Sequence, residues 1–210
     1  MKDIVIIGDS GHAKVIEDIA TSIGFCVVAK LDDKYETYST INSVTIGPTN
    51  SLLAMIEECP TLGVVVAIGS NAIRKKLVES FKLPNHYYRT LIHESTTISP
   101  SAVIGLGSVV MPGAVINAET VIGDHVIINS SCVVEHDCVV ENFVHVSPNA
   151  TLTGGVHVGE GTHVGASATV IPSKKIGKWS VLGAGAVVTC DLQDNVLAVG
   201  VPARVVNSDE

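Results

Sequence analysis

Two different patterns of apolar residues divide the chain. Up to residue 92, short apolar runs alternate with segments in which apolar residues recur every three or four positions. From residue 98 onward, a branched aliphatic residue instead returns at every sixth position, without an insertion. The first pattern is typical of alternating strands and helices, and the six-residue period is typical of a repeat structure. We therefore predict two domains, residues 1–92 and residues 93–210.

The first domain is predicted to be a small α/β domain of Rossmann-like type. Its expected strands are residues 3–7, 26–31, 63–68 and 87–92, and its expected helices are residues 13–23, 48–59 and 71–81. Short apolar strands that alternate with helices favour a parallel sheet covered by those helices.

The second domain is predicted to be a β-solenoid. The residues that repeat every six positions are all branched aliphatics: Ile98, Ile104, Val110, Ile116, Ile122, Ile128, Val134, Val140, Val146, Leu152, Val158, Val164, Val170, Ile176, Leu182 and Val188. Such a repeat is typical of a coil in which three six-residue units form a triangle around an aliphatic axis. The length of the repeat predicts about five coils, closed by residues 197–206.

Composition agrees with a narrow aliphatic core and excludes some functions. Apolar residues make up 46% of the chain, whereas aromatic residues make up only 4%. The net charge of −8 argues against general binding to nucleic acid or to an anionic membrane. No apolar run reaches the roughly 18 residues that span a bilayer, and the N-terminus resembles a strand rather than a secretory leader. We therefore expect a cytoplasmic protein without a membrane span.

The five cysteines do not predict a metal site or a disulfide framework. They are scattered, contain no Cys-x-x-Cys pair, and are Cys26, Cys59, Cys132, Cys138 and Cys190. We expect small thiols in a reducing compartment, with Cys132 and Cys138 pointing into the coil.

His136 is the strongest candidate for chemistry in the repeat. It lies between Glu135 and Asp137, whose carboxylates can orient an imidazole and raise its basicity. Its place in the six-residue unit predicts that it points outward near a corner, with Gly154 at the same corner one coil later. A reference pKa of about 6.5 suits a general base.

His145 follows nine residues later and is expected on another side of the coil. In a trimer, His136 of one chain and His145 of the next chain would line one cleft. No ligand spacing such as His-x-x-x-His is present, so no metal is expected.

Three loops of the first domain follow predicted strands. They contain Gly8-Asp9-Ser10-Gly11-His12, Asp32-Asp33 and Gly69-Ser70-Asn71. Backbone amides there can bind a phosphate, and an acidic residue after the second strand can bind a ribose. Each loop taken alone is equally well explained as a tight turn, and the dinucleotide fingerprint Gly-x-Gly-x-x-Gly is absent.

Taken in order, the motifs resemble a known family over essentially the whole chain. They are Gly8-x-x-Gly11-His12-Ala13-Lys14-Val15, Leu31-Asp32-Asp33, Ala67-Ile68-Gly69, the six-residue repeats, His136-Asp137 and Gly200-Val201-Pro202-Ala203. This pattern resembles the sugar O/N-acetyltransferases of the PglD/NeuD type. The resemblance implies a left-handed parallel β-helix, a homotrimer, and transfer of an acetyl group from acetyl-CoA to a nucleotide-linked amino sugar, here a UDP-4-amino sugar.

The resemblance also implies roles for individual residues. His136 matches the catalytic base and Asp137 the acidic residue that tunes it. The residues that match acetyl-CoA contacts are His145, Gly154, Ala166 and Ala184. The residues that match nucleotide-sugar contacts are Ser10, Gly11, His12, Asp32, Asp33 and Gly69.

One expectation comes from charge and not from the resemblance. No Lys or Arg occurs between residues 91 and 173, and then Lys174, Lys175 and Lys178 follow closely. This basic cluster is expected to meet the phosphates of coenzyme A.

Three other functions remain open at this point. One is O-acetylation of sialic acid or of another sugar in capsule or exopolysaccharide synthesis. Another is a trimeric scaffold that binds a nucleotide sugar without catalysis. The third is a metalloenzyme of the γ-carbonic-anhydrase kind, built on the same coil and requiring zinc between subunits.

Overall fold

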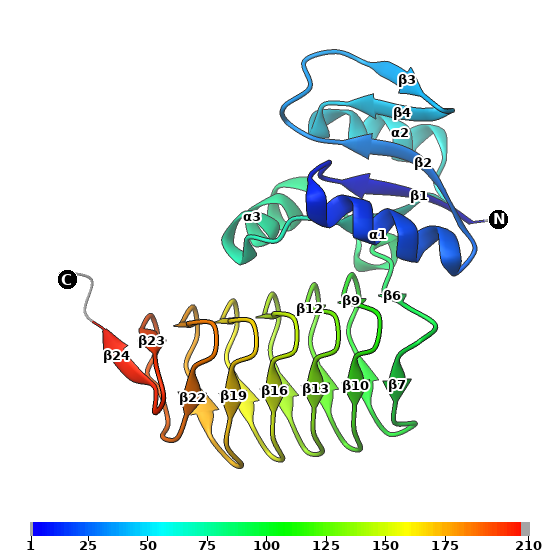
Figure 1. Ribbon diagram of the computed structural model, residues 1–210. Coiled ribbons are helices and arrows are strands. Elements are labelled where there is room, and N and C mark those ends of the chain that lie inside the picture. Colours follow the sequence, from blue (N-terminus) through cyan, green and yellow to red (C-terminus); the bar gives the residue numbers. More distant parts are fainter. Residues whose placement is uncertain (1, 207–210) are drawn as a thin grey trace. The chain divides into compact units, whose positions relative to one another are not determined.

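The computed structural model describes residues 2–206, which form two compact units, and the division between them falls between His93 and Glu94 in the sequence (Figure 1). The first unit is an α/β unit and the second is a parallel β-helix, as the change of period predicts. The boundary lies one residue from the one expected from the sequence.

The first unit contains one mixed sheet and three α-helices. Its strands are β1 (Lys2–Ile7), β2 (Phe25–Leu31), β3 (Ser39–Ile41), β4 (Val44–Gly47) and β5 (Gly63–Val66), in the order β3-β4-β2-β1-β5. Its α-helices are α1 (Gly11–Ser22), α2 (Leu52–Glu58) and α3 (Asn71–Phe81). Strand β1 pairs in parallel with β2 and β5 and supplies the fully buried residues from Ile4 to Ile7.

Three expectations for this unit need correction. The sheet is not purely parallel, because β3 pairs antiparallel with β4. This hairpin escaped prediction because its outer strand is short and exposed, so it carries no apolar run. The expected strand at residues 87–92 is only partly formed. A 3-10 turn (Asn85–Tyr87) follows Pro84, Tyr88 then makes an isolated parallel bridge to Val64, and β6 (Leu91–Ile92) is a strand. The expected helix at residues 48–59 begins with a second 3-10 turn (Thr49–Ser51) before α2.

The second unit contains sixteen two-residue strands, which correspond to the sixteen predicted repeats. They are β7 (Thr97–Ile98), β8 (Val103–Ile104), β9 (Val109–Val110), β10 (Val115–Ile116), β11 (Val121–Ile122), β12 (Ile127–Ile128), β13 (Val133–Val134), β14 (Val139–Val140), β15 (His145–Val146), β16 (Thr151–Leu152), β17 (His157–Val158), β18 (His163–Val164), β19 (Thr169–Val170), β20 (Lys175–Ile176), β21 (Val181–Leu182) and β22 (Val187–Val188). Each strand pairs in parallel with the strand that lies 18 residues further along the chain.

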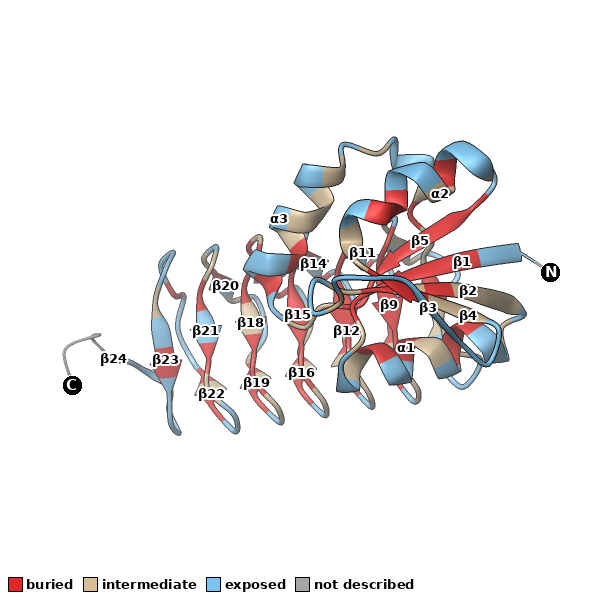
Figure 2. Cartoon of the chain, turned by 90° about the horizontal axis from the view of Figure 1, so that it is seen from above, coloured by how far each residue is buried: buried red, intermediate tan, exposed pale blue. Residues whose placement is uncertain are grey.

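The coil has three faces. Face 1 consists of β7, β10, β13, β16, β19 and β22, and face 2 consists of β8, β11, β14, β17 and β20. Face 3 consists of β6, β9, β12, β15, β18 and β21, continued by β23 (Leu197–Val199) and its antiparallel partner β24 (Arg204–Val206). Within each strand the second residue points inward, and the repeated aliphatics from Val110 onward are buried (Figure 2).

The turns between strands follow a rule that the sequence pattern did not reveal. From Gly107 to Gly185, every sixth residue adopts a left-handed backbone conformation, whether or not it is glycine. Trp179 and Asp137 both do so, with φ of 54° and 59°. Hydrogen bonds between coils offset the local cost, since the Asp137 amide donates to the Ala118 carbonyl oxygen at 2.9 Å.

Candidate active site

His136 lies in the turn between β13 and β14, at the edge where face 1 meets face 2. Its side chain is 62% exposed, so it points outward as expected. The Nδ1 atom of His136 lies 2.7 Å from Oδ2 of Asp137. Because a carboxylate can only accept a hydrogen bond, Nδ1 carries the proton and Nε2 presents its lone pair.

The pKa of His136 is raised above its usual value. The hydrogen bond to Asp137 is the largest cause, and the negative charges of Asp137 and Glu135 add to it, while slight desolvation opposes it. Both carboxylates therefore stabilise the imidazolium that forms when Nε2 takes a proton.

Gly154 occupies the same edge one coil further on. A Cβ atom placed on Gly154 would lie 2.7 Å from both Cε1 and Nε2 of His136, so any other residue here would push the imidazole from its present position. The imidazole therefore lies directly against this glycine, and Nε2 faces the strip of backbone beside it.

His145 lies on face 3 and is separated from His136 within one chain. It is largely buried, and its Nε2 lies 3.0 Å from Nδ2 of Asn129. Its ring packs against the ring of His163, one coil later, with centroids 4.7 Å apart. The two histidines at β15 and β18 thus form a short stack across face 3.

Ala166 and Ala184 lie at a third location, the edge where face 3 meets face 1. They follow β18 and β21 and are one coil apart. The candidate coenzyme contacts are therefore divided in each chain between two edges, with Gly154 beside His136 and the two alanines at the other edge.

In the first unit, the loops predicted to bind a nucleotide gather at the carboxyl ends of β1, β2 and β5. Ser10 is the residue before α1, and Gly11 and His12 begin that helix. The pKa of His12 is lowered to about 4, first by burial and then by the positive charge of Arg74. His12 is therefore neutral at physiological pH.

The two aspartates after β2 have different surroundings. Asp32 organises the loop, since Oδ2 accepts from the Asp9 amide at 2.8 Å and Oδ1 accepts from the Lys34 amide at 3.0 Å. Asp33 instead accepts a hydrogen bond from the hydroxyl of Thr49.

A pocket of about 160 Å³ lies beside these aspartates. It is lined by Ile7, Gly8, Asp32, Asp33, Thr49, Ile68, Ile73 and Leu77. Its wall is apolar on one side and presents oxygen acceptors on the other, an arrangement that suits a base or ribose better than a phosphate. Gly69 lies outside this lining, in the loop that follows Ile68.

Sequence reasoning missed an ion-pair network beneath these loops. Asp9 lies 3.4 Å from Nζ of Lys30 and 3.2 Å from Nζ of Lys34, and it accepts a hydrogen bond from the Tyr35 hydroxyl. That hydrogen bond is the largest cause that keeps the pKa of Asp9 below its usual value. The alternation of charges across Asp9 and residues 30–34 was the available signal, but pairing could not be inferred without the β1–β2 register.

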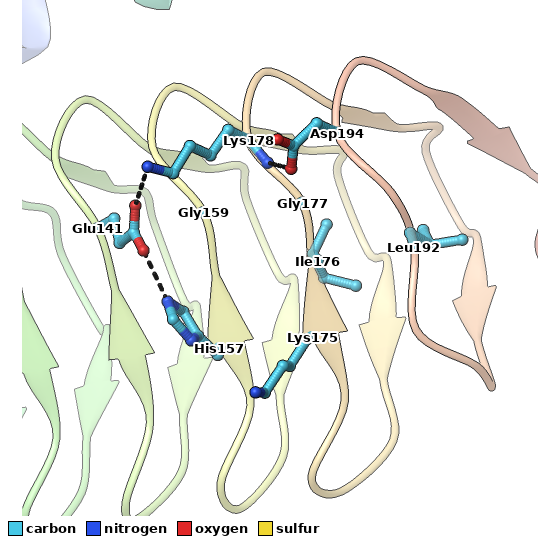
Figure 3. A pocket seen from close by; sticks show the side chains of 9 residues that line it. All are labelled: Glu141, His157, Gly159, Lys175, Ile176, Gly177, Lys178, Leu192 and Asp194. Carbon is cyan, nitrogen blue, oxygen red and sulfur yellow. Dashed lines mark hydrogen bonds and ion pairs between the residues drawn. The ribbon is translucent and has the colours of Figure 1, made fainter.

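The basic cluster of the coil lies among carboxylates. Lys175 and Lys178 line a pocket of about 200 Å³ on face 2, together with Glu141 and His157 (Figure 3). Glu141 Oε1 lies 2.8 Å from Nε2 of His157, and Oε2 lies 3.8 Å from Nζ of Lys178. Lys174 does not line this pocket. The role of the cluster toward coenzyme phosphates stays a prediction.

The two inward cysteines are confirmed as buried thiols. Burial raises the pKa of Cys132 to about 12 and also raises the pKa of Cys138. Neither side chain is exposed, so neither can serve as an acyl-accepting nucleophile.

Residues 2–206 contain neither a cluster of metal ligands nor a membrane-spanning helix. No group of three or more His, Cys, Asp or Glu side chains there is placed to hold a metal ion. None of the described helices is long and apolar enough to cross a membrane.

Family models match both units of the chain. The PglD N-terminal domain matches residues 3–81, and the bacterial transferase hexapeptide repeat matches residues 119–154. UDP-N-acetylbacillosamine N-acetyltransferase from Bacillus subtilis is 43% identical over 102 residues, which are 48% of this chain. The match spans about half the length of that relative, 47%.

Solved structures match over nearly the whole chain. Perosamine N-acetyltransferase from Caulobacter crescentus, in complex with CoA and GDP-perosamine, is 40% identical with a TM-score of 0.89, covering 98% of this chain and 97% of that one. The acetyltransferase domain of PglB from Neisseria gonorrhoeae, in complex with acetyl coenzyme A, is 35% identical with a TM-score of 0.87, covering 98% and 99%. Because both units match, the chain belongs to the PglD/NeuD-type family of hexapeptide-repeat sugar acetyltransferases.

Proposed function

We propose that this protein transfers an acetyl group from acetyl-CoA to the amino group of a nucleotide-linked amino sugar. The observation that carries the proposal is the exposed His136–Asp137 pair beside Gly154, in a fold shared with enzymes solved with CoA and GDP-perosamine or with acetyl coenzyme A. The relatives use GDP-linked and UDP-linked sugars, so the UDP-4-amino sugar expected from the sequence is one of two nucleotide classes to test.

In this proposal His136 is the general base. Its Nε2 takes a proton from the sugar amine as the amine nitrogen attacks the carbonyl carbon of the thioester. Asp137 holds the tautomer through Nδ1 and stabilises the imidazolium. As the C–S bond breaks, the imidazolium returns a proton to the departing thiolate, and the enzyme regains its starting state without an acyl-enzyme.

Gly154 supports two parts of this reaction. Because it has no side chain, a pantetheine arm can lie along the coil next to Nε2 of His136. The amide of Gly155 is already bonded to the His136 carbonyl oxygen at 2.9 Å, so we assign the amide of Gly154 to the oxyanion that develops on the thioester.

The first unit is proposed to bind the nucleotide. Its pocket beside Asp32 and Asp33 suits the base and ribose, and the amides at the start of α1, at Ser10, Gly11 and His12, suit the diphosphate. Gly69 contributes from the loop before α3.

We also propose a homotrimer in which the coenzyme cleft is shared. The outward residues Val103, Val121 and Val139 form an apolar row on face 2, exposed by 58%, 45% and 39%. If face 2 of one protomer packs against face 3 of the next, three copies close around the edge common to both faces. The edge with His136 then meets the neighbour's edge with Ala166 and Ala184, and the neighbour's His145 lies in the wall between them.

The decisive experiment is an acetylation assay with matched acceptors. Purified full-length protein is given acetyl-CoA and a GDP-linked or UDP-linked 4-amino sugar, and CoA release and the product mass are measured. We expect an added acetyl group on nitrogen with one of these acceptors. Transfer only to a hydroxyl of sialic acid, or binding of nucleotide sugar without turnover, would contradict the proposal.

A further inference from the structure

We propose that Arg74 is a positioning residue that shapes the nucleotide-binding loop at residues 68–71. This inference rests on the proposed function, because it assigns a role within the same nucleotide site. Arg74 lies in the first turn of α3 and does not line the pocket itself.

The buried position of Arg74 is unusual for a charged side chain. Its side chain is only 1% exposed, and burial lowers the pKa of its guanidinium to about 9. Removing a guanidinium from water is costly unless its N–H groups find acceptors. The hydrogen bonds of the guanidinium must therefore offset the cost of its burial.

Three of its hydrogen bonds go to one loop. Nη1 donates to the carbonyl oxygens of Ile68 and Gly69, at 2.9 and 3.4 Å. Nη2 donates to Oδ1 of Asn71, itself buried, at 2.9 Å. The planar guanidinium thus holds three acceptors between residues 68 and 71 in one arrangement, which a lysine ammonium cannot reproduce with the same geometry.

The position of these carbonyls determines where the loop amides point. A trans peptide holds its C=O and N–H in opposite directions. With the carbonyls of Ile68 and Gly69 turned toward the guanidinium, the N–H groups of Gly69 and Ser70 point to the other side of the loop. They lie at the amino end of α3, where a helix favours an anionic group such as a diphosphate.

The same guanidinium reaches the second nucleotide loop electrostatically. Its positive charge acts on His12, at the start of α1, and helps to keep that imidazole neutral. A single buried cation therefore acts on both loops that we assign to the nucleotide: it bonds to one directly and adds positive potential at the other.

The test compares Arg74→Lys and Arg74→Met with Arg89→Lys in the full-length protein. Arg89 is a matched control because its guanidinium also donates to backbone carbonyls, those of His86 and Thr61, but next to the start of β5. The dissociation constants of GDP and UDP are measured by calorimetry, together with KM for acetyl-CoA and thermal unfolding.

We expect nucleotide affinity to fall about tenfold or more in Arg74→Met and severalfold in Arg74→Lys, with KM for acetyl-CoA within twofold of wild type. Arg89→Lys should leave both unchanged. If Arg74→Met does not fold, Asn71→Ala, which removes one acceptor, should weaken nucleotide binding severalfold.

The outcomes separate the two proposals. If wild type binds a nucleotide and the folded Arg74 and Asn71 variants bind it equally well, only the positioning role is overturned. If wild type binds neither GDP nor UDP, the proposed function fails and the role of Arg74 fails with it. Equal loss of nucleotide and acetyl-CoA binding would indicate general destabilisation and would also overturn the inference.

Discussion

At the scale of single residues, the proposed chemistry depends on the imidazole of His136 and on the carboxylate of Asp137, its neighbour in the chain. Asp137 can reach Nδ1 of its neighbour because its backbone is in the left-handed conformation, with φ of 59°. Consecutive residues in a strand point to opposite sides, so this contact requires the turn. The turn thus lets Asp137 hydrogen-bond to the imidazole that we propose as the base.

Replacing His136 by alanine should reduce kcat by about 10²–10⁴-fold, the usual contribution of a general base. Because the side chain is exposed and outside the core, the thermal midpoint should stay within a few degrees of wild type. Steady-state kinetics and a melting curve check both parts. An unchanged kcat would remove His136 from the reaction.

Replacing Asp137 by asparagine should move the pH profile in a defined direction. The base works only when neutral, so activity is lost as pH falls through the pKa of His136. Asp137 raises that pKa, so in Asp137→Asn the acid limb of kcat/KM should shift to lower pH, while the plateau falls because the base is weaker.

Asparagine tolerates the left-handed turn, so the backbone should be preserved. The profile is measured from about pH 5 to 9 with the same acceptor, whose amine titrates identically for both proteins. Asp137→Glu serves as the charge-retaining control. An acid limb that does not move would show that Asp137 does not tune His136.

At the scale of elements, the repeat spaces its residues so that one coil supplies the base and the next supplies the room beside it. Strands β13 and β16 pair in register, which places Gly154 over His136. The six-residue period alone predicts this stacking. The contact shows why a glycine is needed there, since any Cβ would meet the imidazole.

Gly154→Ala should therefore affect catalysis more than stability. The added methyl would sit 2.7 Å from Nε2 of His136, so the ring must turn away from the acetyl donor. We expect kcat to fall at least tenfold and acetyl-CoA affinity to weaken, with the coil intact by circular dichroism. Wild-type kinetics in this variant would exclude the proposed path of the coenzyme past Gly154.

At the scale of the whole molecule, the shared cleft that we propose requires more than one chain. His136 and the alanines at positions 166 and 184 lie at different edges of one coil. Packing of face 2 on face 3 of a neighbour brings these edges together, and the apolar row on face 2 supplies surface that favours such packing.

Val121→Asp should disrupt this assembly. Wild type is expected to sediment at about 66 kDa, three times the chain mass of 21.9 kDa, and the variant at about the mass of one chain. Burying an aspartate in the middle of an apolar contact leaves its charge without a partner. The variant should also lose acetyl-CoA binding.

Val115→Asp is the matched control, because Val115 is the outward residue of β10 on face 1 of the same coil. It should leave the mass and the activity unchanged. A Val121→Asp protein that remains a trimer would place the subunit contact elsewhere.

The sequence by itself determined the coil and the outward position of His136 on it. Branched aliphatic residues recur every six positions from Ile98 to Val188, and they fill the interior of the coil. This pattern specifies one core, because only small aliphatic side chains fit along the axis of so narrow a coil. The outward His136, the adjacent Gly154 and the inward Cys132 and Cys138 follow from the same period. Local pattern was enough because every repeat packs only against its neighbours in the coil.

Only the tertiary structure decided the details of the first unit. The β3–β4 hairpin, the network around Asp9 and the bonds of Arg74 join residues that are distant in the chain or hidden in polar segments. Polar side chains carry no periodic signal, and their partners depend on strand register and on the direction of each loop. Contacts of that kind arise from packing in three dimensions and cannot be read along the chain.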